Sequence, residues 1–169
     1  SPPARSLPTS RALRLTLSRK YERCLDPTLS LFPLTLWQDV REAALNLQTA
    51  RYLKEKNPDI EIVGVEPAAS PLITKGVAGV HKIQGIGANF IPQNYDASVV
   101  DKVLTVTDED AMAEAKALVR REGIFAGISS RAASFAARSL ARLPEYKGKR
   151  IVALLPDSGE RYISTGIFE

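Results

Sequence analysis

The sequence predicts an α/β fold in which a partial parallel sheet is flanked by helices. Short runs that are apolar throughout alternate with helical patterns, and turn-forming residues separate them. Strands that are apolar on both faces are typical of parallel sheets, because helices cover both sides of such a sheet. All ten glycines lie at or after Gly64, so the pattern belongs to the later part of the chain.

Residues 1–36 are predicted to be an irregular or foreign N-terminal segment. They hold five prolines and no glycine, no acidic residue precedes Glu22, and no helical or strand period runs through them. A transit peptide is one interpretation, because arginines stand among serines and leucines without acid. A misread exon or a shifted reading frame is the other.

The α/β domain is predicted to begin at residue 37 with a helix and a strand. Apolar residues recur every three or four positions from Trp37 to Leu53, and Pro58 ends this pattern, which indicates an amphipathic helix. The apolar run at 60–65 then favours a buried strand.

The remaining elements continue the alternation. Residues 102–106 are predicted to be a strand, and Thr107 opens a capping box whose helix ends at Gly123. Further along, the sequence predicts a strand at 124–128, an alanine-rich helix at 130–142 and a last strand at 151–155.

Charge and composition exclude several functional classes. After residue 50 there are 16 basic and 15 acidic residues, so most of the net charge of +4 lies in the first 50 residues and no nucleic-acid partner is expected. Cys24 is the only cysteine and His81 the only histidine, so neither an internal disulfide nor a metal site is predicted. No run of 18 apolar residues is present, and no membrane association is expected. We expect an intracellular, soluble protein, in the cytoplasm or, with a transit peptide, in a plastid or mitochondrion.

Two turns that follow predicted strands could carry chemistry, since ligands collect at the carboxyl ends of strands in open parallel sheets. In GISS (127–130) two hydroxyls stand beside a helix N-terminus, and capping by Ser129 or Ser130 is the simpler explanation. PDSGER (156–161) is a charged turn, for which plain solvent exposure is the simpler explanation.

A third segment, HKIQGIG (81–87), has two glycines around one apolar residue and no regular period. Its backbone can bend and approach a ligand closely. It lacks the spacing of a phosphate-binding loop, and His81 has no acid or nucleophile at a motif spacing, so we assign His81 no catalytic role.

Four segments together resemble the cysteine synthases, a family of enzymes that use pyridoxal 5′-phosphate (PLP). They are RYLKEKNPDIEIVGVEP (51–67), HKIQGIGANFIP (81–92), EGIFAGISS (122–130) and PDSGERYISTGIF (156–168). The resemblance implies that residues 37–169 are a partial cysteine synthase domain, the C-terminal part of the fold type II large domain. It also implies a homodimer and a β-replacement in which sulfide displaces the acetate of O-acetylserine, with PLP as electron sink.

The resemblance also assigns residues to the cofactor site. Ser129 corresponds to the serine that hydrogen-bonds the pyridine nitrogen of PLP, and Pro156 to a residue at the edge of the ring. The substrate-entrance segment at the mouth of the site corresponds to Gly85, Ile86 and Gly87.

Two positions depart from the family pattern. Arg131 and Asn89 stand where the family has glycine. A guanidinium at position 131 would bring charge toward the ring nitrogen if it points inward, and would be harmless if it points outward.

Three motifs of the family are not found in this sequence: the Schiff-base lysine in its Ser-x-Lys-Asp-Arg setting, the Thr-Ser-Gly-Asn-Thr substrate loop, and the Gly-Thr-Gly-Gly-Thr phosphate cradle. Residues 43–50, where the cradle is expected, are AALNLQTA. No catalytic residue is therefore assigned.

We expect a truncated cysteine synthase that is inactive alone and does not retain PLP. The alternative is a non-catalytic module that pairs with a full-length synthase subunit. Serine acetyltransferase, a partner of the family, is not expected to bind here, because its docking needs the missing substrate loop.

Overall fold

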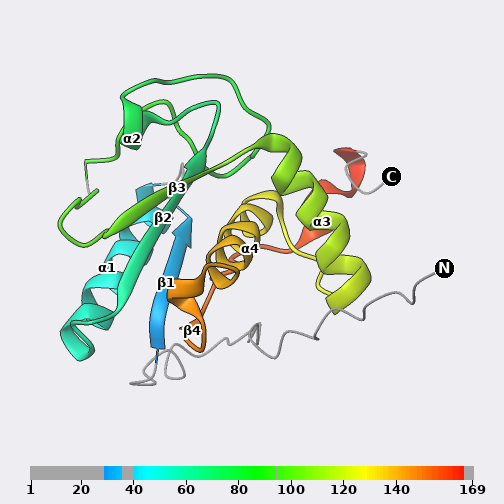
Figure 1. The fold of residues 1–169 in the computed structure, drawn as a ribbon. Coiled ribbons are helices and arrows are strands. Elements are labelled where there is room, and N and C mark those ends of the chain that lie inside the picture. Colours follow the sequence, from blue (N-terminus) through cyan, green and yellow to red (C-terminus); the bar gives the residue numbers. More distant parts are fainter. Residues whose placement is uncertain (1–28, 36–39, 94, 166–169) are drawn as a thin grey trace.

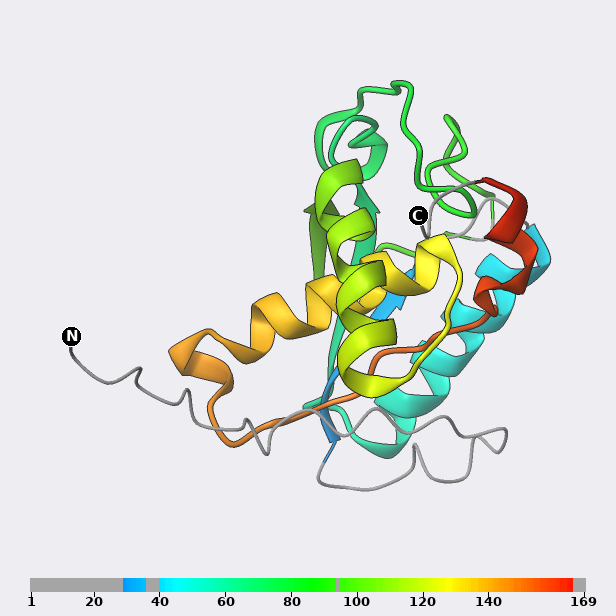
Figure 2. The ribbon, with the colours of Figure 1, turned by 90° about the vertical axis from the view of Figure 1, so that its right-hand side faces the viewer.

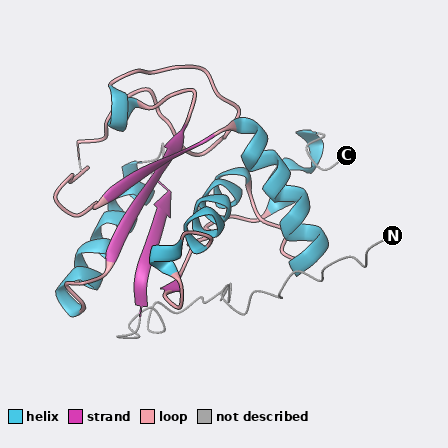
Figure 3. Ribbon diagram, viewed as in Figure 1, coloured by secondary structure: helices cyan, strands magenta, loops and turns pink. Residues whose placement is uncertain are grey.

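The computed structural model describes residues 29–35, 40–93 and 95–165, which form a four-stranded parallel sheet between helices (Figures 1 and 3). The strand order is β3-β2-β1-β4. The strands are β1 (Leu29–Thr35), β2 (Glu61–Pro67), β3 (Lys102–Val106) and β4 (Arg150–Ile151). The main helices are α1 (Val40–Lys56), α3 (Asp108–Glu122) and α4 (Ile128–Ala141). The predicted α/β class with a partial parallel sheet is confirmed.

Helices cover both faces of strand β2, and its side chains alternate between them. Ile62 packs with Leu53 of α1 in one buried cluster. Val63 packs with Leu140 of α4 in another, and Val65 also faces α4. This two-sided burial explains why residues 62–65, in the middle of the strand, carry no polar side chain.

Helix α3 begins and ends where the sequence predicts. The Thr107 hydroxyl oxygen accepts a hydrogen bond from the Asp110 N–H at 3.1 Å, which caps the first turn. At the other end Gly123 adopts a left-handed conformation with φ of 66°, and its N–H reaches the carbonyls of the last turn.

A buried charge joins α3 to α4, which cross in Figure 2. Glu114 of α3 accepts hydrogen bonds from the Ser134 hydroxyl at 2.8 Å and from the Arg138 guanidinium at 2.5 Å. Because a buried carboxylate is costly unless it is paired, these contacts fix how the two helices pack.

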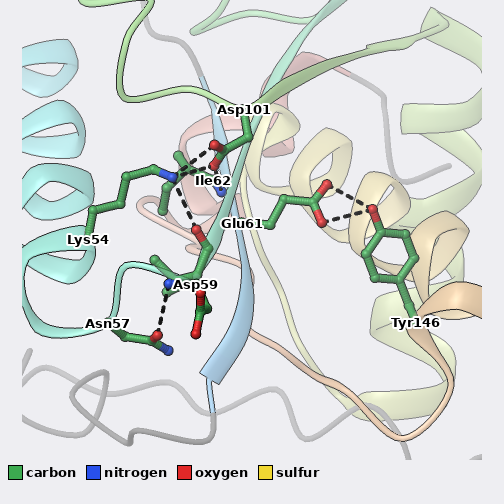
Figure 4. A network of polar contacts seen from close by, with 8 residues as sticks. Lys54, Asn57, Asp59, Glu61, Ile62, Asp101 and Tyr146 are labelled. Atoms are coloured by element: carbon green, nitrogen blue, oxygen red, sulfur yellow. Dashed lines mark hydrogen bonds and ion pairs between the residues drawn. The ribbon is translucent and has the colours of Figure 1, made fainter.

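Polar contacts anchor the amino end of β2 (Figure 4). Asp101 accepts from the Ile62 N–H at 2.7 Å and pairs with Lys54 of α1. On the other side the Tyr146 hydroxyl donates its proton to the Glu61 carboxylate, whose two oxygens lie 2.8 and 3.0 Å away. Burial, together with Glu61, raises the pKa of Tyr146 to about 12.

The expectation of irregular structure up to residue 36 was wrong for Leu29–Thr35. These residues form β1, which pairs in parallel with β2 and with β4. Pro33 has no N–H for a ladder and argues against an inner strand, but pairing on both sides overrides this local signal. Residues 1–28, with Cys24, lie outside the described residues.

Two other strands predicted from the sequence differ from those in the structure. Residues 124–128 form no strand, because Ala126 makes only an isolated antiparallel bridge to Ser158 and α4 already begins at Ile128. A short apolar run cannot distinguish a strand from a turn that enters a buried helix. The last strand, expected at 151–155, ends at Ile151.

Neither a membrane-spanning helix nor a metal-binding cluster is present in the described residues. No helix in them is long and apolar enough to cross a membrane. No group of three or more His, Cys, Asp or Glu side chains in them could hold a metal ion.

Candidate functional site

The first turn of α4 is the point where the candidate segments meet. On one side residues 157–159 run along the turn before α4, since Gly127 N–H donates to the Asp157 carbonyl at 3.1 Å and Gly159 N–H to that of Phe125 at 3.0 Å. On the other side Ile86 lies in one buried cluster with Ile128. The same cluster includes Val106, the last residue of β3, and Val65 in the second half of β2, so the site lies at the carboxyl end of the sheet.

Ser129 is fully buried in this turn, and its hydroxyl oxygen has no hydrogen-bond partner. No side chain caps α4, so the capping interpretation was wrong for Ser129 and for Ser130. A buried hydroxyl without a partner is rare in folded proteins, because it forfeits its hydrogen bonds to water. Ser129 therefore has the properties of a group whose partner is a ligand.

Asp157 closes the same turn from outside. It accepts a hydrogen bond from the Ser130 hydroxyl at 2.7 Å and another from the Tyr162 hydroxyl at 2.8 Å. Burial and this carboxylate raise the pKa of Tyr162 to about 12. Pro156 is exposed beside Asp157. The solvated-turn interpretation of this segment was therefore wrong for Asp157, whose carboxylate is turned inward.

Gly127 is what allows Asp157 to come so close. A Cβ on Gly127 would lie 1.9 Å from one Asp157 carboxylate oxygen. Because real Cβ atoms do not approach other atoms to that distance, any other residue at this position would push the carboxylate away.

Arg131 points inward, which local sequence did not decide. Its side chain is only 1% exposed, and its Nε–H donates to the Ala126 carbonyl at 3.1 Å. Burial lowers the pKa of Arg131, although the Asp157 carboxylate opposes this shift. The outward alternative for position 131 was wrong.

The substrate-entrance segment is tightly built. Ile86 is fully buried, and Gly85 and Gly87 have φ angles of 95° and 72°, a region that favours glycine. A Cβ on Gly87 would lie 2.5 Å from Nε2 of His81. Asn89 also has a positive φ, 57°, which fits a position where the resemblance expects glycine.

A pocket opens beside this segment, between it and Leu47 of α1. Its wall includes Glu66, a buried carboxylate that accepts hydrogen bonds from the N–H groups of Ile73 (2.9 Å) and Thr74 (3.2 Å). These contacts hold the start of the short helix α2 (Leu72–Lys75) above the carboxyl end of β2.

Residues 44–157 match the family model described as pyridoxal-phosphate dependent enzyme. The chain belongs to this family. Among curated members it is 53% identical over 116 residues to cysteine synthase B of Campylobacter jejuni, covering 69% of this chain and 38% of that protein. It is 48% identical over 127 residues to cysteine synthase A of Escherichia coli K12, covering 70% of this chain and 39% of that protein.

Solved structures of the PLP-dependent enzymes agree. The crystal structure of cysteine synthase from Entamoeba histolytica superposes with a TM-score of 0.77 and 36% identity, covering 86% of this chain and 42% of that one. The described elements are thus those of a PLP-dependent enzyme of the α/β type, and this chain spans less than half the length of these relatives.

The residues of this chain fit one side of a PLP site. The partnerless hydroxyl of Ser129 suits the pyridine nitrogen, since a hydroxyl can donate to or accept from a ring nitrogen. When bound, PLP supplies an electron sink to the substrate amino acid. The phosphate side does not fit, because α1 runs as a helix from Val40 to Lys56 through the residues where the glycine cradle is expected. We therefore assign no reaction step to the described residues.

Proposed function

We propose that this chain forms the ring-binding wall of a cysteine synthase site and does not catalyse β-replacement by itself. The observation that carries the proposal is the buried, partnerless hydroxyl of Ser129 at the start of α4. The relatives named cysteine synthase support the reaction class and, with it, O-acetylserine and sulfide as substrates.

Each site residue would act through position or charge. Ser129 would hydrogen-bond the ring nitrogen without a formal charge, so that the ring would not be forced to stay protonated. Pro156 would border the ring, on a segment that Asp157 holds in place through Ser130. The substrate-entrance segment, Gly85–Gly87, would form the mouth of the site.

The first test uses the chain alone. After incubation with PLP, dialysis and borohydride reduction, we expect no cofactor linked covalently to lysine and no cysteine formed from O-acetylserine and sulfide. A retained absorbance band that borohydride fixes to the protein would overturn the proposal that the chain is inactive.

The second test restores the missing parts. A chimera would join the N-terminal part of E. coli cysteine synthase A to this chain, so that its phosphate loop runs into Arg51. We expect the chimera to bind PLP, and Ser129→Ala in it to weaken that binding about tenfold or more, the effect of one buried hydrogen bond to a charged or polar ring atom. Equal affinity with and without the Ser129 hydroxyl would contradict the assignment.

The same chimera tests Arg131. Because its guanidinium is buried beside the first turn of α4, we expect Arg131→Gly to increase PLP affinity or turnover. Identical affinity and turnover in the two chimeras would show that Arg131 does not disturb the site.

A second candidate function rests on exposed apolar side chains. Val80, Phe90 and Ile91 in the connection between β2 and β3 are 94%, 53% and 49% exposed. Such groups favour a protein partner, and a full-length subunit of a homodimeric synthase is the candidate. Mixing this chain with E. coli cysteine synthase A and measuring mass by sedimentation tests it. If the mixture sediments only as the two separate proteins, with no heavier complex, this candidate function is excluded.

The origin of residues 1–36 stays a prediction. If they are a transit peptide, a fusion of residues 1–36 to a fluorescent protein would enter a plastid or mitochondrion. If they come from a misread exon, the genomic sequence upstream would encode the phosphate cradle in another frame.

A further inference from the structure

His81 is the only histidine of the chain, and neither the family assignment nor the proposed function uses it. Its ring Nε2 lies 3.1 Å from the carbonyl oxygen of Gly87, six residues later. The ring also lies against the Gly87 backbone, where a Cβ would come within 2.5 Å of Nε2. The imidazole thus bridges the two ends of the segment 81–87.

The chemistry of this contact determines the tautomer. A carbonyl oxygen only accepts hydrogen bonds, so Nε2 must carry the proton that it donates to Gly87. In the neutral ring Nδ1 is then the bare nitrogen, and Nδ1 is buried and has no hydrogen-bond partner. A proton placed on Nδ1 instead would have no acceptor, which favours the tautomer protonated at Nε2.

Other contacts hold the same segment from outside. Asp108, in the first turn of α3, accepts a hydrogen bond from the Lys82 N–H at 2.9 Å. Ile83 and Ile86 are both buried in the cluster that includes the start of α4. Between these contacts, Gly85 and Gly87 have positive φ angles, which allow the backbone to make a tight turn.

We propose that His81, which donates its Nε2–H to the Gly87 carbonyl, is a positioning residue of the substrate-entrance segment. Its hydrogen bond closes residues 81–87 into a loop and keeps Gly85–Gly87 rigid. The backbone at the mouth of the site therefore moves as a single unit. The name of the segment rests on the proposed function. The His81 contact itself does not.

The tautomer can be measured on the unmutated chain. With a single histidine, long-range ¹H–¹⁵N spectra of the ¹⁵N-labelled chain contain one imidazole, and no assignment problem arises. In the neutral form of the ring we expect a protonated Nε2 and a bare Nδ1. A ring protonated at Nδ1, or one that averages rapidly between the two tautomers, would overturn the proposal.

Two amide variants separate the hydrogen bond from ring packing. In His81→Gln the side-chain N–H₂ is as far from the backbone as Nε2, whereas in His81→Asn it is one bond shorter and reaches only the Nδ1 position. We expect amide hydrogen exchange at Gly85, Ile86 and Gly87 to rise about fivefold in the Asn variant, the factor of one ordinary hydrogen bond. The Gln variant should stay within about twofold of the parent.

The outcomes are distinct. Equal increases in both variants would mean that ring packing, not the donor, holds the segment, and no increase in either would mean that His81 holds nothing. Amides in the middle of α4, such as that of Ala136, serve as the internal control and should not change. The exchange measurements use the chain without cofactor or substrate, so they remain valid even if the chimera fails to bind PLP. Conversely, if His81 proves not to hold the segment, the assignment of Ser129 is unaffected.

Discussion

Ser129 and Ser130 are neighbours in one helical turn, yet removal of their hydroxyls should change stability in opposite directions. The Ser129 hydroxyl is buried without a partner, a state that costs about 1–3 kcal/mol. Alanine also has a helix propensity about 0.5 kcal/mol better than serine. We therefore expect Ser129→Ala to raise the free energy of unfolding by about 1.5 kcal/mol or more.

Ser130→Ala is the matched control. It removes the 2.7 Å hydrogen bond to the Asp157 carboxylate, and a bond to a charged group contributes about 1.5–3 kcal/mol. After the same propensity gain of about 0.5 kcal/mol, a net loss of about 1–2.5 kcal/mol is expected. The propensity term cancels in the comparison, which leaves at least about 2.5 kcal/mol between the two variants, well above the error of a denaturation curve.

Urea unfolding followed by far-ultraviolet circular dichroism measures both variants. The reasoning fails if Ser129→Ala destabilises the chain as much as Ser130→Ala does, because the Ser129 hydroxyl would then have a partner within the fold. If Ser129→Ala stabilises the chain, the Ser129 hydroxyl lowers the stability of the fold, which is expected of a group kept for a function such as the proposed contact with the cofactor.

Two further variants test the contacts around the site and the sheet. Gly127→Ala should lower stability by about 3 kcal/mol, since its Cβ would displace Asp157 and both hydrogen bonds to that carboxylate. Gly123→Ala is the control, because a Cβ on Gly123 would meet open space and only the φ of 66° is unfavourable; it should lower stability by only about 1 kcal/mol. Equal losses of stability in the two variants would contradict the clash between residue 127 and Asp157. Tyr146 has its pKa raised to about 12, so the folded state keeps a proton that the unfolded state releases from about pH 10. Stability should fall as pH rises from 10 to 12, and Tyr146→Phe, which also loses the bond to Glu61, should show a smaller fall; an unchanged pH dependence would refute this.

Where local chemistry decides structure, the sequence predicted it well. The α3 boundaries follow from Thr107 and Gly123, and both residues act as predicted. Strand β3 is formed by the predicted residues, 102–106, because a short apolar run stands directly before the capping residue. These signals lie within a few residues of the feature they determine.

Signals that depend on distant residues were missed. β1 is a strand only because β2 and β4 pair with it, and no periodicity within residues 29–35 indicated this. The apolar run 124–128 was assigned as a strand because nothing nearby reveals that Asp157 packs onto Gly127 and splits it.

At the site, family resemblance pointed to Ser129, but only burial shows that its hydroxyl lacks a partner. The roles of Asp157 and His81 required contacts across 27 and six residues, respectively. A charged residue in a turn and a lone histidine carry no sequence signal for such contacts. The inward position of Arg131 likewise depends on the Ala126 carbonyl, which a turn places beneath it.

Strand β1 stands between β2 and β4, although the match to the PLP-dependent enzymes begins only at residue 44. Parallel ladders join backbone groups, so pairing such as that of Leu34 with Gly64 is largely indifferent to which side chains the strand carries. A chain that began at residue 37 would lose this central ladder, and β4 would be cut off from β2 and β3. By the same reasoning, the ladder would tolerate another strand-forming segment in place of residues 29–35. Expression or solubility of this chain would therefore report on the sheet and would be no measure of catalytic activity.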